Sequence, residues 1–323
     1  MQYRQLGRSG LKVSRLCLGT MNFGPQTEET AAQAIMDAAL DAGINFFDTA
    51  NVYGGSKHRG WTEEILGRWF AKGGERRERT VLATKVYGTM EDRPNESKLS
   101  ALHIRRALDA SLQRLKTDHI DLYQFHHVDR NTPWEEIWQA VDVAVQQGKI
   151  LYAGSSNFAG WHLAQAQESA ARRQGYGLVS EQSIYNLLTR DVELEVIPAA
   201  QHYGLGILPW SPLHGGLLGG VLKKEDAGVR RTQGRALEAL KKHRNQIRRY
   251  EDFADELGQE PGQLALAWLL HQPAVTAPIV GPRTQEQLSA ALGALQVKLD
   301  AEALTRLDTI FPGRRTAPED YAW

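Results

Sequence analysis

Short runs of aliphatic and β-branched residues alternate with longer amphipathic stretches along almost the whole chain. This alternation is typical of repeated strand–helix units, which build a parallel sheet. The apolar runs lie near residues 15–20, 44–48, 80–85, 119–126, 150–155, 177–182, 205–210 and 275–280. Such a series predicts an α/β fold, specifically a (β/α)8 TIM barrel.

The segments between the runs are expected to be helical, several of them with Ser, Thr or Asp just before the first turn. Their expected starts lie near Glu28, Trp61, Leu99, Pro133, Ala159, Asp191 and Pro261. Residues 3–14 precede the first run and predict a β-hairpin that turns between Gly7 and Gly10. We expect this hairpin to plug the bottom of the barrel.

The stretch 211–235 is rich in Gly and carries a basic cluster at Lys223, Lys224, Arg230 and Arg231. Loops of this length in a compact domain are usually functional. The stretch therefore predicts a mobile lid over the top of the barrel.

Length and composition are consistent with a single domain that has no net charge. The 323 residues exceed the usual domain size, but barrels of this class commonly run past ~250 residues, so residues 1–323 are expected to form a single domain. Lys plus Arg and Asp plus Glu number 38 each, and no long-range field therefore favours nucleic acid or an anionic membrane. The single cysteine, Cys17, excludes an intramolecular disulfide and suits a reducing compartment. With no membrane-spanning run and no signal-peptide pattern, a cytoplasmic location is expected.

Four polar residues follow predicted strands and are candidates for a shared site. Asp48 ends the second apolar run and Tyr53 follows it in a Gly-rich loop, while Lys85 and His126 each close a later run. In a parallel barrel, the carboxyl ends of the strands meet at the face where active sites are built. Taken singly, each residue would more often have a structural role; together they favour a catalytic site.

The four residue types suit the delivery of a proton to a carbonyl oxygen. A phenol has a pKa near ~10, and a neighbouring ammonium such as that of Lys85 is expected to lower the pKa of Tyr53. The Asp48 carboxylate would keep Lys85 charged in a pocket of low dielectric. The imidazole of His126 could hydrogen-bond and orient the carbonyl. No metal ligand set is expected.

Seven segments in order resemble those of the aldo-keto reductases, and the resemblance covers nearly the whole chain. They are Asp48-Thr49-Ala50-x-x-Tyr53, Ala83-Thr84-Lys85, Asp121-Leu122-Tyr123-x-x-His126, Gly154-Ser155-Ser156-Asn157-Phe158, Glu181-Gln182-Ser183-x-Tyr185-Asn186, Pro209-Trp210-Ser211-Pro212-Leu213 and Ile279-Val280-Gly281-Pro282-Arg283. The resemblance implies reduction of an aldehyde or ketone with NADPH, by hydride transfer with Tyr53 as general acid. It implies a small-molecule carbonyl substrate as partner and leaves monomer and homo-oligomer open.

Within this family the chain looks most like actinobacterial sugar reductases that process nucleotide-linked deoxysugars, on residues 53–64 and 155–218. The loop Gly54–Gly60 carries Lys57, His58 and Arg59, which could bind a diphosphate or could simply be solvated. Family members that saturate a carbon–carbon double bond can carry Glu at the position of His126, so a nucleotide-sugar 2,3-enoyl reductase is an alternative. A redox-sensing regulatory subunit that resembles potassium-channel β subunits is a second alternative.

A dinucleotide site must be built without a Gly-x-Gly-x-x-Gly fingerprint or a Walker loop, because neither motif is present. The resemblance implies that Ser156, Asn157 and Gln182 hold the nicotinamide amide and that Trp210 stacks on its ring. On its own, Trp210 would more often be a core residue. The resemblance also implies further cofactor contacts, which are Gly19, Thr20, Met21, Asp48, Ser211, Leu213, Gly216 and Gln287.

The segment after the eighth run predicts a phosphate site. Gly281-Pro282-Arg283-Thr284 opens a helix, so free backbone amides, the positive end of the helix dipole and a guanidinium meet there. Arg283 is the candidate for the 2′-phosphate of NADPH, although alone it would more often be a solvated charge. The family often has Asn where this chain has Ala291, which leaves adenine contact at Gln287 open.

Overall fold

Eight parallel strands form one curled sheet in the computed structural model, which describes residues 1–56, 58–226 and 234–322. The strands follow the order β10-β3-β4-β5-β6-β7-β8-β9. Their bounds are β3 (Cys17–Gly19), β4 (Phe46–Asp48), β5 (Val81–Val86), β6 (Ile120–Phe125), β7 (Ile150–Ser156), β8 (Leu178–Ile184), β9 (Gly206–Trp210) and β10 (Ile279–Val280). Ile207 bridges Val275 between the two outer strands, so the barrel is nearly closed. The TIM-barrel prediction is confirmed.

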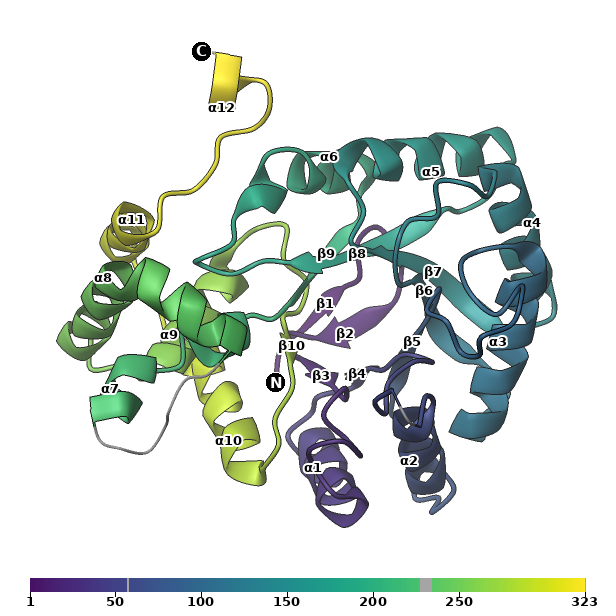
Figure 1. Ribbon diagram of the computed structural model, residues 1–323, viewed down its shortest axis with the longest axis horizontal. Coiled ribbons are helices and arrows are strands. Elements are labelled where there is room, and N and C mark those ends of the chain that lie inside the picture. The colour runs from purple at the N-terminus through teal and green to yellow at the C-terminus, as the bar shows by residue number, and fades with distance from the viewer. Residues whose placement is uncertain (57, 227–233, 323) are drawn as a thin grey trace.

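Helices follow most of the strands and cover the outside of the sheet (Figure 1). They are α1 (Glu29–Asp41), α2 (Trp61–Phe70), α3 (Ala101–Leu115), α4 (Trp134–Gln146), α5 (Gly160–Arg172), α6 (Val196–Tyr203), α9 (Pro261–His271) and α10 (Gln285–Gly293). Six of the expected starts lie within two residues of a helix, and the short 3-10 helix η1 (Asp191–Glu193) begins at the seventh. Two of these helices begin at a side-chain cap: Ser100 accepts the backbone N–H of His103, and Thr284 accepts the backbone N–H of Gln287.

A β-hairpin closes the N-terminal end of the barrel, as the sequence predicts. Its strands β1 (Tyr3–Gln5) and β2 (Lys12–Ser14) pair antiparallel, and Leu6 at the turn is fully buried among the residues of the barrel interior. Gly7 adopts a positive φ of 56°, and a Cβ there would lie 2.5 Å from the carbonyl oxygens of Val179 and Gly204. Only glycine lets the turn sit this deeply against the strands.

Two apolar layers result from the alternation of side chains along the strands. Phe46 points into the barrel, where it packs with Ala83, Leu122 and Leu208. The next residue, Phe47, points outward and stacks on Trp69 of α2, with ring centroids 5.6 Å apart. A fully buried sheet of this kind fixes its register strongly, and so fixes which side chains emerge at each barrel end.

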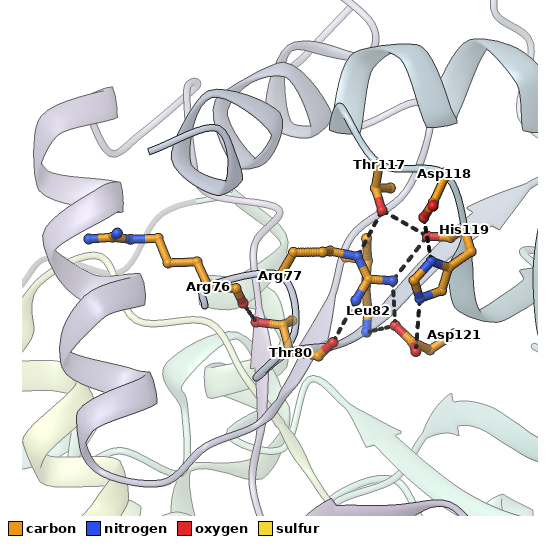
Figure 2. A network of polar contacts seen from close by, with 8 residues as sticks. All are labelled: Arg76, Arg77, Thr80, Leu82, Thr117, Asp118, His119 and Asp121. Carbon is orange, nitrogen blue, oxygen red and sulfur yellow. Dashed lines mark hydrogen bonds and ion pairs between the residues drawn. The ribbon is translucent and has the colours of Figure 1, made fainter. Parts of the chain in front are cut away.

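The N-terminal ends of β5 and β6 are joined by an ion-pair network around Arg77 (Figure 2). Its guanidinium donates to the carbonyl oxygens of Thr80 and His119, to the Thr117 hydroxyl and, at 2.8 Å, to Oδ2 of Asp121. The same Asp121 oxygen accepts the backbone N–H of Leu82 at 2.8 Å. One carboxylate thus ties the loop before β5 to the start of both strands.

The stretch 211–235 differs from the expected lid in its described part. It contains the 3-10 helix η2 (His214–Gly216) and helix α7 (Val221–Asp226), and α8 (Gly234–Glu256) follows. Leu217 and Leu222 are buried against Leu240 and Ile247 of α8. Residues 211–226 therefore form a packed element rather than a long open loop. Arg230 and Arg231 lie outside the described residues.

The chain continues after α10 through the 3-10 helix η3 (Ala294–Gln296) into α11 (Ala301–Ile310) and the short α12 (Glu319–Ala322). The last segment, beyond Phe311, extends away from the barrel with most of its residues exposed (Figure 1). Among the described residues, no helix combines the length and apolar character that a membrane crossing requires. The same residues contain no group of three His, Cys, Asp or Glu side chains placed to hold a metal ion.

Candidate active site

Asp48, Lys85 and Tyr53 meet at the C-terminal end of the barrel. Lys85 Nζ donates to Asp48 Oδ2 at 2.5 Å, to the carbonyl oxygen of Thr49 at 2.9 Å and to the Tyr53 hydroxyl oxygen at 3.1 Å. Lys85 is fully buried, Asp48 nearly so, and Tyr53 is half-buried. The parallel register pairs Asp48 with Ala83. Lys85 lies two residues after Ala83 in β5, so its side chain points to the same face of the sheet as those of Ala83 and Asp48.

The second carboxylate oxygen of Asp48 is held by two glutamines. Gln124 Nε2 and Gln182 Nε2 each donate to Asp48 Oδ1 at 2.9 Å, and Gln182 also donates to Gln124 Oε1 at 3.1 Å. The sequence-based prediction of the site missed Gln124. The signal was available, because Gln124 lies two residues before His126 on one strand and must therefore share its face.

Charge and burial act in opposite directions on Lys85. Burial alone would lower the pKa of Lys85, but the Asp48 carboxylate and Tyr53 raise it above its usual value. Lys85 therefore stays charged, in agreement with the role predicted for Asp48.

The predicted lowering of the pKa of Tyr53 is wrong in this structure. Burial disfavours the phenolate strongly enough to raise the pKa of Tyr53 above 10, although Lys85 acts in the lowering direction. The sequence identifies the cation but not the depth of the pocket, and depth decides the sign. Tyr53 is therefore a protonated phenol at neutral pH, with a proton available to donate.

His126 lies beside Tyr53 with its ring edge-on, and the ring centroids are 5.8 Å apart. Burial, together with the charge of Lys85 and the neighbouring His127, lowers the pKa of His126 from 6.5 to about 3. The imidazole is therefore neutral at physiological pH. His127 is exposed, and its Nδ1 accepts the N–H of Val128.

Ser156, Asn157, Gln182 and Trp210 also lie at this end of the barrel and are linked to one another. Asn157 Oδ1 accepts the indole N–H of Trp210 at 3.0 Å, and Asn157 Nδ2 donates to Ser156 Oγ at 3.0 Å and to the His126 carbonyl at 3.2 Å. Asn157 adopts a positive φ of 61°, a conformation that Asn tolerates better than most residues. The indole of Trp210 is half-buried and held in one orientation.

The hydrogen-bonding capacity that these side chains retain is complementary to a primary carboxamide. Both amide protons of Asn157 and of Gln182 are already donated within the protein. Among the described residues, the Ser156 hydroxyl proton has no acceptor, and Gln182 Oε1 has no donor. One donor and free acceptor lone pairs on Gln182 and Asn157 match the C=O and NH2 of such a group. The residues therefore fit a nicotinamide.

The predicted phosphate site lies at the start of α10. Arg283 is exposed, and its guanidinium makes no hydrogen bond or ion pair in the part of the chain that the structure describes. Its backbone N–H donates to Gln287 Oε1 at 2.9 Å, so Gln287 caps the helix start. Asn22 Nδ2 donates to the Gly281 carbonyl at 2.9 Å and joins this segment to the loop after β3.

The remaining predicted cofactor residues also lie at the C-terminal end of the barrel. Thr20 Oγ1 donates to the Asp48 carbonyl at 2.9 Å, and Met21 is 59% exposed. A Cβ on Gly19 would lie 2.6 Å from Cγ2 of Ile279, so only glycine fits there without a shift. Ser211 and Leu213 follow β9 and are half-buried; Asn186 Nδ2 donates to the Ser211 carbonyl. Gly216 ends η2 on the same side of β9.

The cations of the loop Gly54–Gly60 are partly committed to the protein. Arg59 donates to the Met90 carbonyl at 3.0 Å, and His58 lies 3.3 Å from a carboxylate oxygen of Glu64 while stacking on Trp61. Lys57 lies outside the described residues. Of the three residues that could bind a diphosphate, the two that the structure describes therefore both make contacts within the protein.

Comparison with known proteins identifies relatives that match almost the whole chain. An uncharacterized oxidoreductase, YrpG, of Bacillus subtilis (strain 168) is 56% identical over 328 residues, which cover 100% of both chains. Versiconal hemiacetal acetate reductase of Aspergillus parasiticus is 35% identical over 98% of this chain and 100% of its own. A probable voltage-gated potassium channel subunit beta of Oryza sativa subsp. japonica is 35% identical over 99% and 100%. Residues 15–311 match the family model described as "Aldo/keto reductase family", and the chain belongs to that family.

Proposed function

We propose that the protein is an NADPH-dependent reductase that converts an aldehyde or ketone to the alcohol, with Tyr53 as general acid. The observation that carries the proposal is the position of Lys85 Nζ, within hydrogen-bond distance of both Asp48 and Tyr53 at 2.5 and 3.1 Å. A protonated phenol beside a charged ammonium is an acid whose conjugate base is stabilised as it forms.

The proton step follows from these contacts. As hydride reaches the carbonyl carbon, the C=O π bond breaks and its electron pair moves to oxygen, which takes the Tyr53 proton. Lys85 stabilises the phenolate left behind, and Asp48 keeps Lys85 charged between turnovers. His126 is neutral, so it can donate one N–H hydrogen bond to the carbonyl without competing for the proton.

Members of this family generally use nicotinamide cofactors. A bound NADPH would supply the hydride. Ser156, Asn157 and Gln182 would hold its carboxamide, and Trp210 would cover one face of the ring. Arg283, which is exposed at a helix start, supports NADPH over NADH, because a guanidinium there can pair with a 2′-phosphate.

The substrate class remains broad within this proposal. The resemblance to actinobacterial sugar reductases supports a sugar or nucleotide-linked keto-sugar. A nucleotide-sugar 2,3-enoyl reductase is less well supported, because His126 stands where Glu would supply a different proton environment. A redox-sensing regulatory subunit is favoured by one observation, the 35% identity to a probable potassium channel subunit beta.

Steady-state and single-turnover assays with NADPH and NADH would test the proposal against a panel of aldehydes, ketones and sugar nucleotides. We expect multiple turnovers with NADPH and at least one carbonyl compound. One fast oxidation of bound cofactor followed by very slow exchange would favour the regulatory role instead. Activity confined to carbon–carbon double bonds would favour the enoyl reductase.

A further inference from the structure

Glu181 is a buried carboxyl group outside the hydrogen-bonded chain of the proposed mechanism. It lies in β8 next to Gln182, and successive side chains of a strand point to opposite faces. Gln182 faces Asp48 inside the barrel, so Glu181 faces outward, where it is fully buried. The register places it directly beside Ser155 of β7.

The carboxyl group of Glu181 gathers donors from both strands and from the bend that follows β7. Oε2 accepts the Ser155 hydroxyl at 2.5 Å, while Oε1 accepts the Ser183 hydroxyl at 2.6 Å and the backbone N–H of Phe158 at 3.1 Å. Within the described residues Glu181 has no ion pair. Burial raises the pKa of Glu181 to about 7, and these hydrogen bonds keep it from rising further.

The bend Ser156–Phe158 is the part of the backbone that these contacts hold. Phe158 is buried and its ring packs on Trp134, so the bend is fixed on its outer side by the ring and by Glu181. On its inner side, Asn157 holds a left-handed conformation and binds the indole of Trp210. A left-handed residue relaxes readily unless its neighbours hold it.

We propose that Glu181 is a positioning residue for the nicotinamide half of the cofactor site, because its carboxyl group fixes the bend that orients Ser156, Asn157 and, through Asn157, Trp210. This inference rests on the proposed function. It assigns no contact between Glu181 and the cofactor. It implies that Glu181 affects the nicotinamide end of the dinucleotide and leaves the 2′-phosphate end, at Arg283, unaffected.

Two ligands can distinguish an effect on the nicotinamide end of the site from an effect on the 2′-phosphate end. NADPH engages the whole site, whereas 2′-phospho-ADP-ribose has the same adenosine, diphosphate and 2′-phosphate but no nicotinamide. Calorimetric titration of the full-length protein is expected to show that Glu181→Gln weakens NADPH about tenfold and leaves 2′-phospho-ADP-ribose unchanged. Glu181→Ala should weaken NADPH further, because Gln retains one acceptor for the Phe158 N–H and Ala retains none.

Glu63 provides a matched control. It is also a fully buried carboxylate on the outer side of the barrel, and it accepts from Thr84, Ser111 and Arg114. Glu63→Gln should lower stability, as Glu181→Gln does, without changing the ratio of the two affinities. Equal weakening of both ligands by Glu181→Gln, or an unchanged NADPH affinity, would overturn the proposal.

A measurement without ligand separates this inference from the proposed function. Hydrogen exchange of the peptide that spans residues 155–160 should speed up in Glu181→Gln and stay at the wild-type rate in Glu63→Gln. Unchanged exchange in Glu181→Gln would overturn the positioning role whatever the wild-type protein binds. A wild-type protein that fails to bind NADPH would instead refute the proposed function.

Discussion

Strand β5 has an ion pair of similar length at each end, a partly exposed one at its N-terminal end and a buried one at its C-terminal end. At the N-terminal end, Arg77 lies 2.8 Å from Asp121, and three of its other four N–H donors are accepted by two backbone carbonyls and a hydroxyl (Figure 2). At the C-terminal end, Lys85 lies 2.5 Å from Asp48 and contacts Tyr53, whose hydroxyl proton has no acceptor among the described residues.

The difference separates a structural network from a chemical one. In the Arg77 network, four of the five guanidinium N–H donors are hydrogen-bonded within the protein, so the group mainly stabilises the fold. The Lys85 network is saturated up to Tyr53 and then ends in a single free proton. Strand β5 therefore takes part in a stabilising network at one end of the barrel and in the candidate active site at the other, which is the end where active sites of this fold are built.

Tyr53→Phe tests the free proton directly. We expect carbonyl reduction to fall ~100- to 10,000-fold, because the general acid is lost, while NADPH affinity stays nearly unchanged. Stopped-flow single turnovers would measure the hydride step. Wild-type rates in the variant would show that Tyr53 is not the general acid. The C-terminal network would then no longer differ from the Arg77 network in presenting a reactive group.

Arg77→Met tests the N-terminal end. The variant leaves Asp121 buried without its cation, so the free energy of unfolding should fall by about 3 kcal/mol. Urea denaturation would measure the loss. The activity per folded molecule should match the wild type, and a lower value would show that the two ends are energetically linked.

Arg283 is a second donor without a partner near the C-terminal end of the barrel, and Arg283→Ala tests what it binds. The guanidinium has no partner among the described residues, so its loss should cost little stability but should weaken NADPH by about 1.5–3 kcal/mol. NADH, which lacks the 2′-phosphate, should bind as before. Fluorescence titration of both cofactors decides the matter, and equal losses would mean that Arg283 does not discriminate between them.

His126→Asn is expected to have the smallest effect. The folded pKa of His126 is about 3, below the unfolded value of 6.5, so unfolding takes up a proton between these values. Wild-type stability should therefore be full above pH 6.5 and fall as the pH drops toward 3. Between pH 7 and pH 4.5, the free energy of unfolding should therefore fall by about 1–2 kcal/mol less in His126→Asn than in the wild type. Urea denaturation at the two pH values would measure both losses. Parallel losses in both proteins would contradict the burial of a neutral imidazole.

Much of this site could be predicted because it depends on strand ends. Asp48, Lys85 and His126 each close an apolar run, and a parallel sheet brings such ends together whatever the helices do. The pKa direction of Tyr53 could not be predicted the same way. It depends on how deeply the phenol is buried, and burial is set by side chains from distant strands.

Helix α8 shows a different limit. Its buried positions Leu240, Ile247, Tyr250 and Ala254 follow helical spacing, so the periodic signal was present in the sequence. We expected helices only between strands, and α8 lies between β9 and α9 where the repeating unit has no place for a second helix. The Gly-rich residues before it favoured the expectation of a long loop, where the structure has η2 and α7.

The hydrogen bond from Gln182 to Asp48 joins residues 134 positions apart. Contacts of such sequence separation form late, because a large loop must close before they contribute. A chain refolding from denaturant can regain most of its helical signal while β8 is still unpaired, and Asp48 then lacks one of its two amide donors. Recovery of turnover should consequently lag behind recovery of circular dichroism, so that enzymatic activity reports the last stage of barrel assembly.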